Sequence, residues 1–163
     1  VGALMTFAKA CGAEVEYVRP HGAMYKMASE DFSFSCAIAR AIKKCSNWLL
    51  YYGEAGDTLE KVGDFEKIRV VNELKINKSY TVEGKIDYDG KDVVDIPPCI
   101  NRLHTIVKTS RIDNNAKGFT PVKVDSIHFS ASAPNNLVVA RRAYELIKPV
   151  PVNFNRVKES GWV

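Results

Sequence analysis

The chain has 163 residues, a formal net charge of +4 and 46% hydrophobic residues, which is the composition of a folded globular protein. Its length favours one domain. No apolar run approaches the roughly 18 residues of a membrane-spanning helix, and the basic residues are spread along the chain, whereas nucleic acids bind a clustered basic face. The sequence therefore predicts a protein that binds neither membranes nor nucleic acids.

The first half of the chain predicts helices and strands in alternation. Apolar residues at helical spacing, short β-branched or continuous apolar runs, and glycine or proline stops between them define the elements. In chain order they are a helix over 4–11, a strand over 15–18, a helix over 34–45, a strand over 48–52, a short helix over 57–62 and a strand over 68–74.

The second half begins with a polar segment that contains two glycines. Residues 78–96 are expected to be the least regular part, although the alternation around Tyr80 and Ile86 permits a hairpin. The pattern then predicts a helix over 100–107, a strand over 122–127, a helix over 137–147 and an irregular tail from Pro149 onward.

The cysteines carry no metal or redox motif. Their positions, 11, 36, 45 and 99, form no C-x-x-C pair. Cys11, Cys36 and Cys45 each fall on the apolar stripe of an expected helix, so they are interpreted as buried, reduced thiols in a cytoplasmic protein.

Four strands, each followed by a helical pattern, predict an α/β fold with a parallel sheet. Ligand sites of such folds lie at the carboxyl ends of the strands. His21 follows the first strand, Glu73 ends the third and His128 ends the fourth, so we expect these three side chains to converge on one cavity. Histidine with a carboxylate serves acid–base chemistry or a divalent metal. Glu54, after the second strand, is expected to be a solvated loop residue, and Tyr25 could simply pack.

A resemblance to a known family rests first on residues 18–25, Val-Arg-Pro-His-Gly-Ala-Met-Tyr. This segment resembles the [VK]-[KR]-P-H-G-x-[LM]-Y signature of the LamB/YcsF family. In register with it, residues 53–56 resemble the family's G-x-A-G, residues 73–80 resemble E-x-F-A-D-R-x-Y, and residues 126–128 resemble the start of C-x-H-G-D. The resemblance covers most of the chain.

The resemblance implies a parallel β/α barrel of the seven-stranded glycoside hydrolase/deacetylase type. Residues 1–163 would form a single domain that holds only its last four β/α units, as the C-terminal portion of a longer barrel. The family's activity implies a component of an ATP-dependent 5-oxoprolinase, which hydrolyses the lactam 5-oxoproline to glutamate with separate B and C subunits. No Walker-type motif is present in the sequence, so ATP would bind without a P-loop.

Residue roles follow from the same resemblance. His21 and Glu73 would polarise the substrate or transfer protons, Lys78 would bind a carboxylate or phosphate, and Tyr25 and His128 would line the pocket. The resemblance assigns no metal ligands within these residues.

Two departures from the family pattern leave alternatives open. Asn77 and Lys78 stand where the family has Asp-Arg, and Phe129 and Ser130 stand where it has Gly-Asp, so two carboxylates are lost. One alternative is therefore a non-catalytic or impaired member that acts as a binding or assembly subunit. The other is a metal-dependent amidase or deacetylase on the same barrel, for which this segment offers too few ligands.

Overall fold

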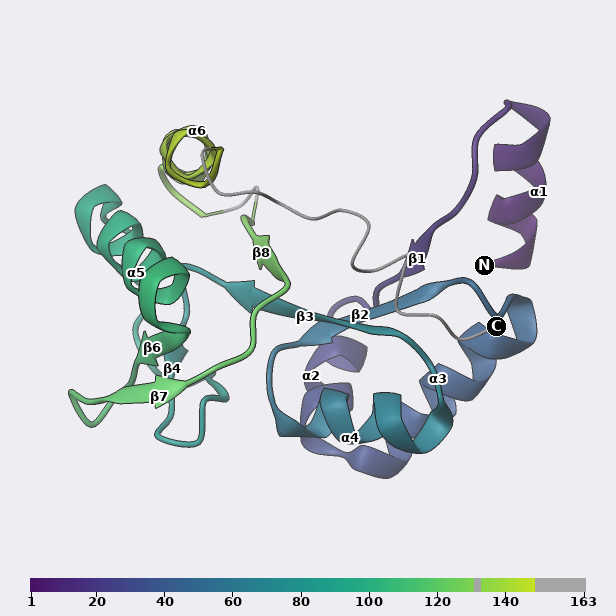
Figure 1. Cartoon of the computed structure of the whole chain (residues 1–163), viewed down its shortest axis with the longest axis horizontal. Coiled ribbons are helices and arrows are strands. Elements are labelled where there is room, and N and C mark those ends of the chain that lie inside the picture. Colours follow the sequence, from purple (N-terminus) through teal and green to yellow (C-terminus); the bar gives the residue numbers. More distant parts are fainter. Residues whose placement is uncertain (131–132, 149–163) are drawn as a thin grey trace. The chain divides into compact units, whose positions relative to one another are not determined.

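The computed structural model describes residues 1–130 and 133–148. The chain divides into two compact units (Figure 1). The first unit comprises residues 1–74 and 123–126, and the second comprises, of the described residues, 75–122, 127–130 and 133–148. Because the sheet and the helices that cover it belong mainly to the first unit, most of the predicted βα pattern is found there.

The first unit contains a parallel sheet. Its strands are β1 (Tyr17–Val18), β2 (Leu50–Glu54) and β3 (Val70–Lys75), and β8 (Ser126–His128) follows β3 in the sheet order β1-β2-β3-β8. β1 pairs with β2 and β2 pairs with β3, both in parallel. Its helices are α1 (Gly2–Ala10), α2 (Ala23–Glu30), α3 (Phe32–Cys45) and α4 (Asp57–Glu66). The prediction of an α/β fold with a parallel sheet is confirmed.

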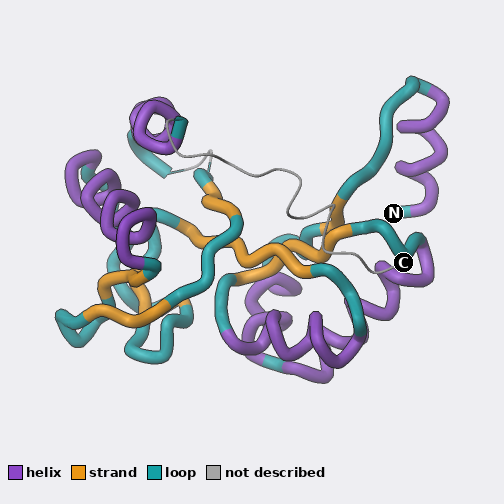
Figure 2. Tube along the Cα trace, viewed as in Figure 1, coloured by secondary structure: helices purple, strands orange, loops and turns teal. Residues whose placement is uncertain are grey.

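One face of this sheet packs against helices and forms the core. Figure 2 shows α2, α3 and α4 on one side of β2 and β3. Successive side chains of a strand point to opposite faces, and those of Tyr51 and Val70 lie on the helical face. The Tyr51 hydroxyl is 2.9 Å from the Ser35 hydroxyl of α3, which gives this buried phenol a hydrogen-bond partner. The buried core comprises Cys36, Ala39, Ile42, Leu49, Tyr51, Leu59, Val62 and Ile68.

The opposite face of the same strands is polar and aromatic. The rings of Tyr17 and Tyr52 meet there with their centroids 4.5 Å apart. Tyr52 alternates with Tyr51 along β2, and Glu54 lies two residues further on the same face. Glu54 is in register with Glu73 of β3, so both carboxylates belong to this face. The two buried carboxylates thus lie on the side of the sheet that Tyr52 faces.

A polar network joins β3 to the segment that leads into β8. The Asn72 side-chain amide is fully buried and donates to the carboxylates of Glu60 and Asp125, the latter over 2.7 Å. The Asp125 backbone N–H donates to the Asn72 carbonyl over 2.9 Å. Lys123 Nζ lies 3.0 and 3.1 Å from the two Glu60 oxygens. These contacts pair the buried amide nitrogen of Asn72 and fix residues 123–126 beside β3.

Among its described residues, the second unit contains two small antiparallel hairpins and two helices. They are β4 (Ser79–Tyr80) with β5 (Ile86–Asp87), β6 (Arg111–Asp113) with β7 (Phe119–Pro121), α5 (Ile96–Thr109) and α6 (Asn136–Ile147). α5 packs against both α6 and β6. The predicted hairpin around Tyr80 and Ile86 is confirmed, since these two residues pair in the ladder.

Arg102 of α5 organises this unit from a nearly buried position. Its guanidinium donates to both Asp113 oxygens over 2.7 Å, and to the carbonyl oxygens of Ile76 and Lys78 over 2.8 and 2.6 Å. Such paired, charge-assisted hydrogen bonds are stronger than neutral ones and fix direction. Arg102 therefore holds the turn that carries Asn77 and Lys78.

Several local predictions need correction. α2 and the β6–β7 hairpin were not expected, because their apolar residues are too few to show a period. The first and last strands are shorter than predicted, at 17–18 and 126–128. Cys36 is buried as expected, but Cys11, which caps α1, and Cys45, the last residue of α3, are exposed. The tail expected from Pro149 lies outside the described residues.

No helix in the described part of the chain combines the length and apolar character needed to cross a membrane.

The core of the first unit predicts a large effect for Leu49→Ala. Leu49 is fully buried, so its truncation should lower the free energy of unfolding by about 2–5 kcal/mol through lost burial and a cavity. Leu137→Ala is the matched control, because Leu137 is 67% exposed, and it should change stability by less than about 0.5 kcal/mol. Urea unfolding of both variants checks this expectation, and equal effects would contradict the assigned core.

The second unit should lose stability in acid through Asp113. The hydrogen bonds from Arg102 hold the pKa of Asp113 below its usual 3.8 in the folded state. A depressed folded pKa contributes stability above the unfolded value, and this contribution disappears as the pH falls through the folded value. Thermal unfolding between pH 7 and pH 2 should therefore depend less on pH in Asp113→Asn than in the wild type. Asp89→Asn, at an exposed carboxylate, should retain the wild-type dependence.

Candidate functional site

The polar face of the sheet carries a buried ion pair between the ends of two strands. Glu73 lies near the end of β3 with only 5% of its side chain exposed. Arg19 directly follows β1, and its Nε lies 2.6 and 2.9 Å from the two Glu73 carboxylate oxygens. A carboxylate at such a position would be costly without a cationic partner. Arg19 therefore keeps Glu73 in place across the intervening strand β2.

Tyr25 of α2 completes this group. The Arg19 guanidinium carbon lies 4.5 Å from the centre of the Tyr25 ring, within the range of a cation–π contact. Tyr25 is 3% exposed, and burial raises the pKa of its phenol well above the usual range, with further increases from the carboxylates of Glu73 and Glu54. Tyr25 thus remains a neutral phenol at any physiological pH and is a suitable hydrogen-bond donor.

Glu54 is a second buried carboxylate on this face, which corrects its interpretation as a solvated loop residue. It is 6% exposed and is the last residue of β2, in register with Glu73. The Ala55 backbone N–H donates to the Glu73 carbonyl over 2.9 Å, so the parallel ladder extends past this point. The strand starts and ends two residues later than its apolar run, and this shift brings Glu54 inside the sheet.

His21 lies at the accessible edge of the same unit. It is exposed and stands between buried Pro20 and Gly22, the residue before the first turn of α2. Gly22 has φ 59° and ψ −131°, a conformation that side chains in the L configuration rarely adopt. An added Cβ at this glycine would meet nothing within 4 Å, so the restriction is conformational. The glycine thus sets the direction in which the chain leaves His21 and enters α2.

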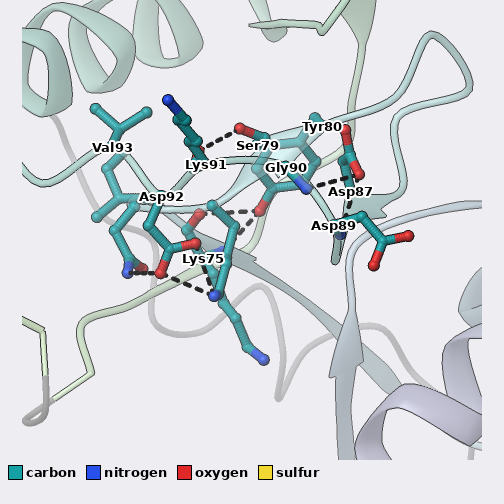
Figure 3. Close-up of polar contacts among 12 residues, drawn as sticks. Lys75, Ser79, Tyr80, Asp87, Asp89, Gly90, Lys91, Asp92 and Val93 are labelled. Atoms are coloured by element: carbon teal, nitrogen blue, oxygen red, sulfur yellow. Dashed lines mark hydrogen bonds and ion pairs between the residues drawn. The ribbon is translucent and has the colours of Figure 1, made fainter.

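Lys78 and Asn77 belong to the second unit, at the turn between β3 and β4. Figure 3 shows this turn beside the segment that contains Lys91, Asp92 and Val93. Lys78 Nζ lies 2.8 Å from each Asp92 carboxylate oxygen. The cation that the sequence assigns to a substrate anion is therefore already paired with a carboxylate of the chain.

His128 ends β8 and is half-buried, as are Phe129 and Ser130 after it. It belongs to the second unit, whereas His21 and Glu73 belong to the first. The structure thus brings Arg19, Tyr25 and Glu73 together, and the convergence of His128 with His21 and Glu73 stays a prediction.

No group of three histidine, cysteine, aspartate or glutamate side chains within the described residues is arranged to hold a metal ion. The cluster that is present combines a carboxylate fixed by a guanidinium with a neutral phenol. Such a set can orient a polar substrate and donate or accept hydrogen bonds to it.

Sequence reasoning missed Arg19 as the partner of Glu73. The signal was available, because a charged residue at the end of one apolar strand needs a countercharge, and Arg19 directly follows the neighbouring strand. The spacing of residues along the sequence does not reveal the strand order, in which only β2 separates β1 from β3. Glu54 was missed because the strand extends beyond its apolar run.

Comparison with known proteins identifies the relatives of this chain. It is 25% identical over 162 residues to the A component of 5-oxoprolinase from Bacillus subtilis (strain 168), covering 98% of the chain and 63% of that protein. The A component from Tolumonas auensis is 41% identical over 86 residues, or 53% of the chain and 34% of that protein. The chain thus spans less than two thirds of the length of these relatives.

A solved structure has the same fold. The lactam utilization protein from Thermus thermophilus superimposes with a TM-score of 0.79 at 27% sequence identity, over 91% of this chain and 61% of that one. The family model for LamB/YcsF matches residues 1–160, which is nearly the whole sequence. The chain therefore belongs to the LamB/YcsF family, as the Pro-His-Gly segment and its surroundings indicate.

Proposed function

We propose that this chain is part of the A component of a 5-oxoprolinase, which opens the lactam ring of 5-oxoproline to give glutamate with partner B and C subunits. The observation that carries the proposal is the group of Arg19, Tyr25 and Glu73 at the carboxyl ends of parallel strands, with exposed His21 two residues after Arg19 in the chain. We further propose that the sheet is the last part of a longer β/α barrel.

The chemistry of the reaction matches the residue types in this group. Opening a five-membered amide ring requires a group that activates water or the amide oxygen, and donors for the charge that develops there. In this proposal His21 exchanges the proton, because it is exposed and lies two residues after Arg19 in the chain. Glu73, fixed by Arg19, orients the reacting groups, and the neutral Tyr25 phenol donates a hydrogen bond.

The remaining predicted site residues would bind the substrate. Lys78 would receive the substrate carboxylate, since an ammonium group is a compact partner for a small anion. His128 would line the pocket from the end of β8. Both of these residues belong to the second unit.

The candidate site contains no recognised motif for the phosphates of ATP. Arg19 is paired with Glu73, Lys78 is assigned to the substrate carboxylate, and the sequence has no Walker-type phosphate-binding loop. We therefore derive no step through the nucleotide in this chain. The energy of ATP would enter through the assembled complex with its partner subunits.

The second candidate is a non-catalytic or impaired member that serves as a binding or assembly subunit. Two features favour this candidate. Asn77 and Lys78 replace the Asp-Arg pair of the family, and Lys78 forms an ion pair with Asp92. A metal-dependent amidase or deacetylase would need ligands from outside the described residues.

Replacement of His21 tests the proposed function. His21→Ala should lower the rate of 5-oxoproline turnover in the assembled enzyme by at least about a hundredfold, because it removes a group that transfers protons. Its thermal unfolding should match the wild type, because His21 is exposed. His104→Ala is the matched control, since His104 is exposed on α5 and should leave turnover unchanged. Full turnover by His21→Ala would remove this residue from the mechanism, and an inactive wild type in the complete complex would favour the non-catalytic member.

A further inference from the structure

A short segment of the second unit is fixed against the turn that carries Lys78. The Ser79 hydroxyl donates to the Lys91 carbonyl over 2.6 Å, and the Val93 backbone N–H donates to the Asn77 carbonyl over 2.7 Å (Figure 3). These two hydrogen bonds hold the residues on either side of Asp92. The segment 91–93 is thus anchored through its backbone at both ends.

The anchored segment directs one carboxylate at Lys78. Both Asp92 oxygens lie 2.8 Å from Lys78 Nζ, and one of them lies 3.5 Å from the Asn77 amide nitrogen. Each of these nitrogens is a donor, so the carboxylate is held by an ammonium and approached by an amide. A small free carboxylate would make the same contacts.

The ion pair itself is weak enough to exchange. The side chains of Lys78 and Asp92 are 30% and 36% exposed, and exposed ion pairs contribute little to stability. The Lys78 backbone, in contrast, is fixed by the hydrogen bond that its carbonyl accepts from Arg102 over 2.6 Å. A competing carboxylate can therefore replace Asp92 at Lys78 while the turn keeps its place.

We propose that Asp92 is an internal competitor for the carboxylate of the substrate at Lys78. The inference rests on the role of Lys78 in the proposed function and adds its regulation: the segment 91–93 occupies the anion site until a carboxylate ligand displaces Asp92. Asp92 then lowers the apparent affinity for carboxylates and does not act as a catalytic residue.

The experiment compares two variants that each remove one carboxylate charge, one inside the segment 91–93 and one just before it. Asp92→Asn keeps the shape of the side chain and removes the competing charge, whereas Asp89→Asn changes an exposed carboxylate three positions earlier. Calorimetry on the full-length protein measures the Kd of 5-oxoproline, of succinate, and of 2-pyrrolidinone, which is the same lactam without a carboxylate. Unfolding temperatures confirm that the variants are folded.

We expect Asp92→Asn to bind 5-oxoproline and succinate about two- to fivefold more tightly, the range that an exposed ion pair allows. Binding of 2-pyrrolidinone should not change, and Asp89→Asn should match the wild type. In a Lys78→Gln background, Asp92→Asn should have no effect on succinate, because the two residues act on the same site.

The remaining outcomes separate this inference from the proposed function. Weaker or unchanged carboxylate binding by Asp92→Asn would overturn the inference and would show that Asp92 only orients the lysine. Tighter succinate binding without any 5-oxoproline binding would support the competitor role and contradict the proposed substrate. Failure of every variant to bind either carboxylate would overturn both.

Discussion

The cost of burying the Glu73 carboxylate is the constraint on which the polar side of the first unit depends. A buried negative charge is tolerated only with a cation and hydrogen bonds nearby. Arg19, just after β1, supplies the positive charge and donates hydrogen bonds to both Glu73 carboxylate oxygens. Because β2 lies between these strands, the pair spans the sheet and couples the ends of β1 and β3. Tyr25 packs on the guanidinium, so the start of α2 is tied to the same charge.

A second arginine has the corresponding role in the other unit. Arg102 is 7% exposed, and its two parallel hydrogen bonds to Asp113 join α5 to β6. Its remaining donors hold the backbone around Asn77 and Lys78. An arginine thus holds the Glu73 side chain in the first unit and the backbone around Lys78 in the second. Arginine suits this purpose better than lysine, since its planar fork carries several donors in set directions.

The fold was predictable from the sequence where apolar residues repeat at the spacing of a helix or follow one another as in a buried strand. The strands around Tyr51 and Val71 and the helix that contains Ile42 show strong apolar patterns, and the structure confirms them. The predictions were wrong where the local pattern is short or where a strand continues through charged residues, as at Glu54. The family was predictable because the Pro-His-Gly segment is specific. Pairing partners such as Arg19 for Glu73 and Asp92 for Lys78 depend on tertiary contacts, so spacing along the chain did not reveal them.

The backbone at Gly22 has a stereochemical consequence. Its φ of 59° and ψ of −131° are the mirror image of an ordinary extended, polyproline-like conformation. An L residue at this position is disfavoured although space for a Cβ exists, whereas a D residue would adopt this conformation without strain. Glycine is therefore favoured after His21 because natural amino acids have the L configuration, and not because a larger side chain would lack space. In a chemically synthesised chain, D-alanine would suit this turn better than its natural enantiomer.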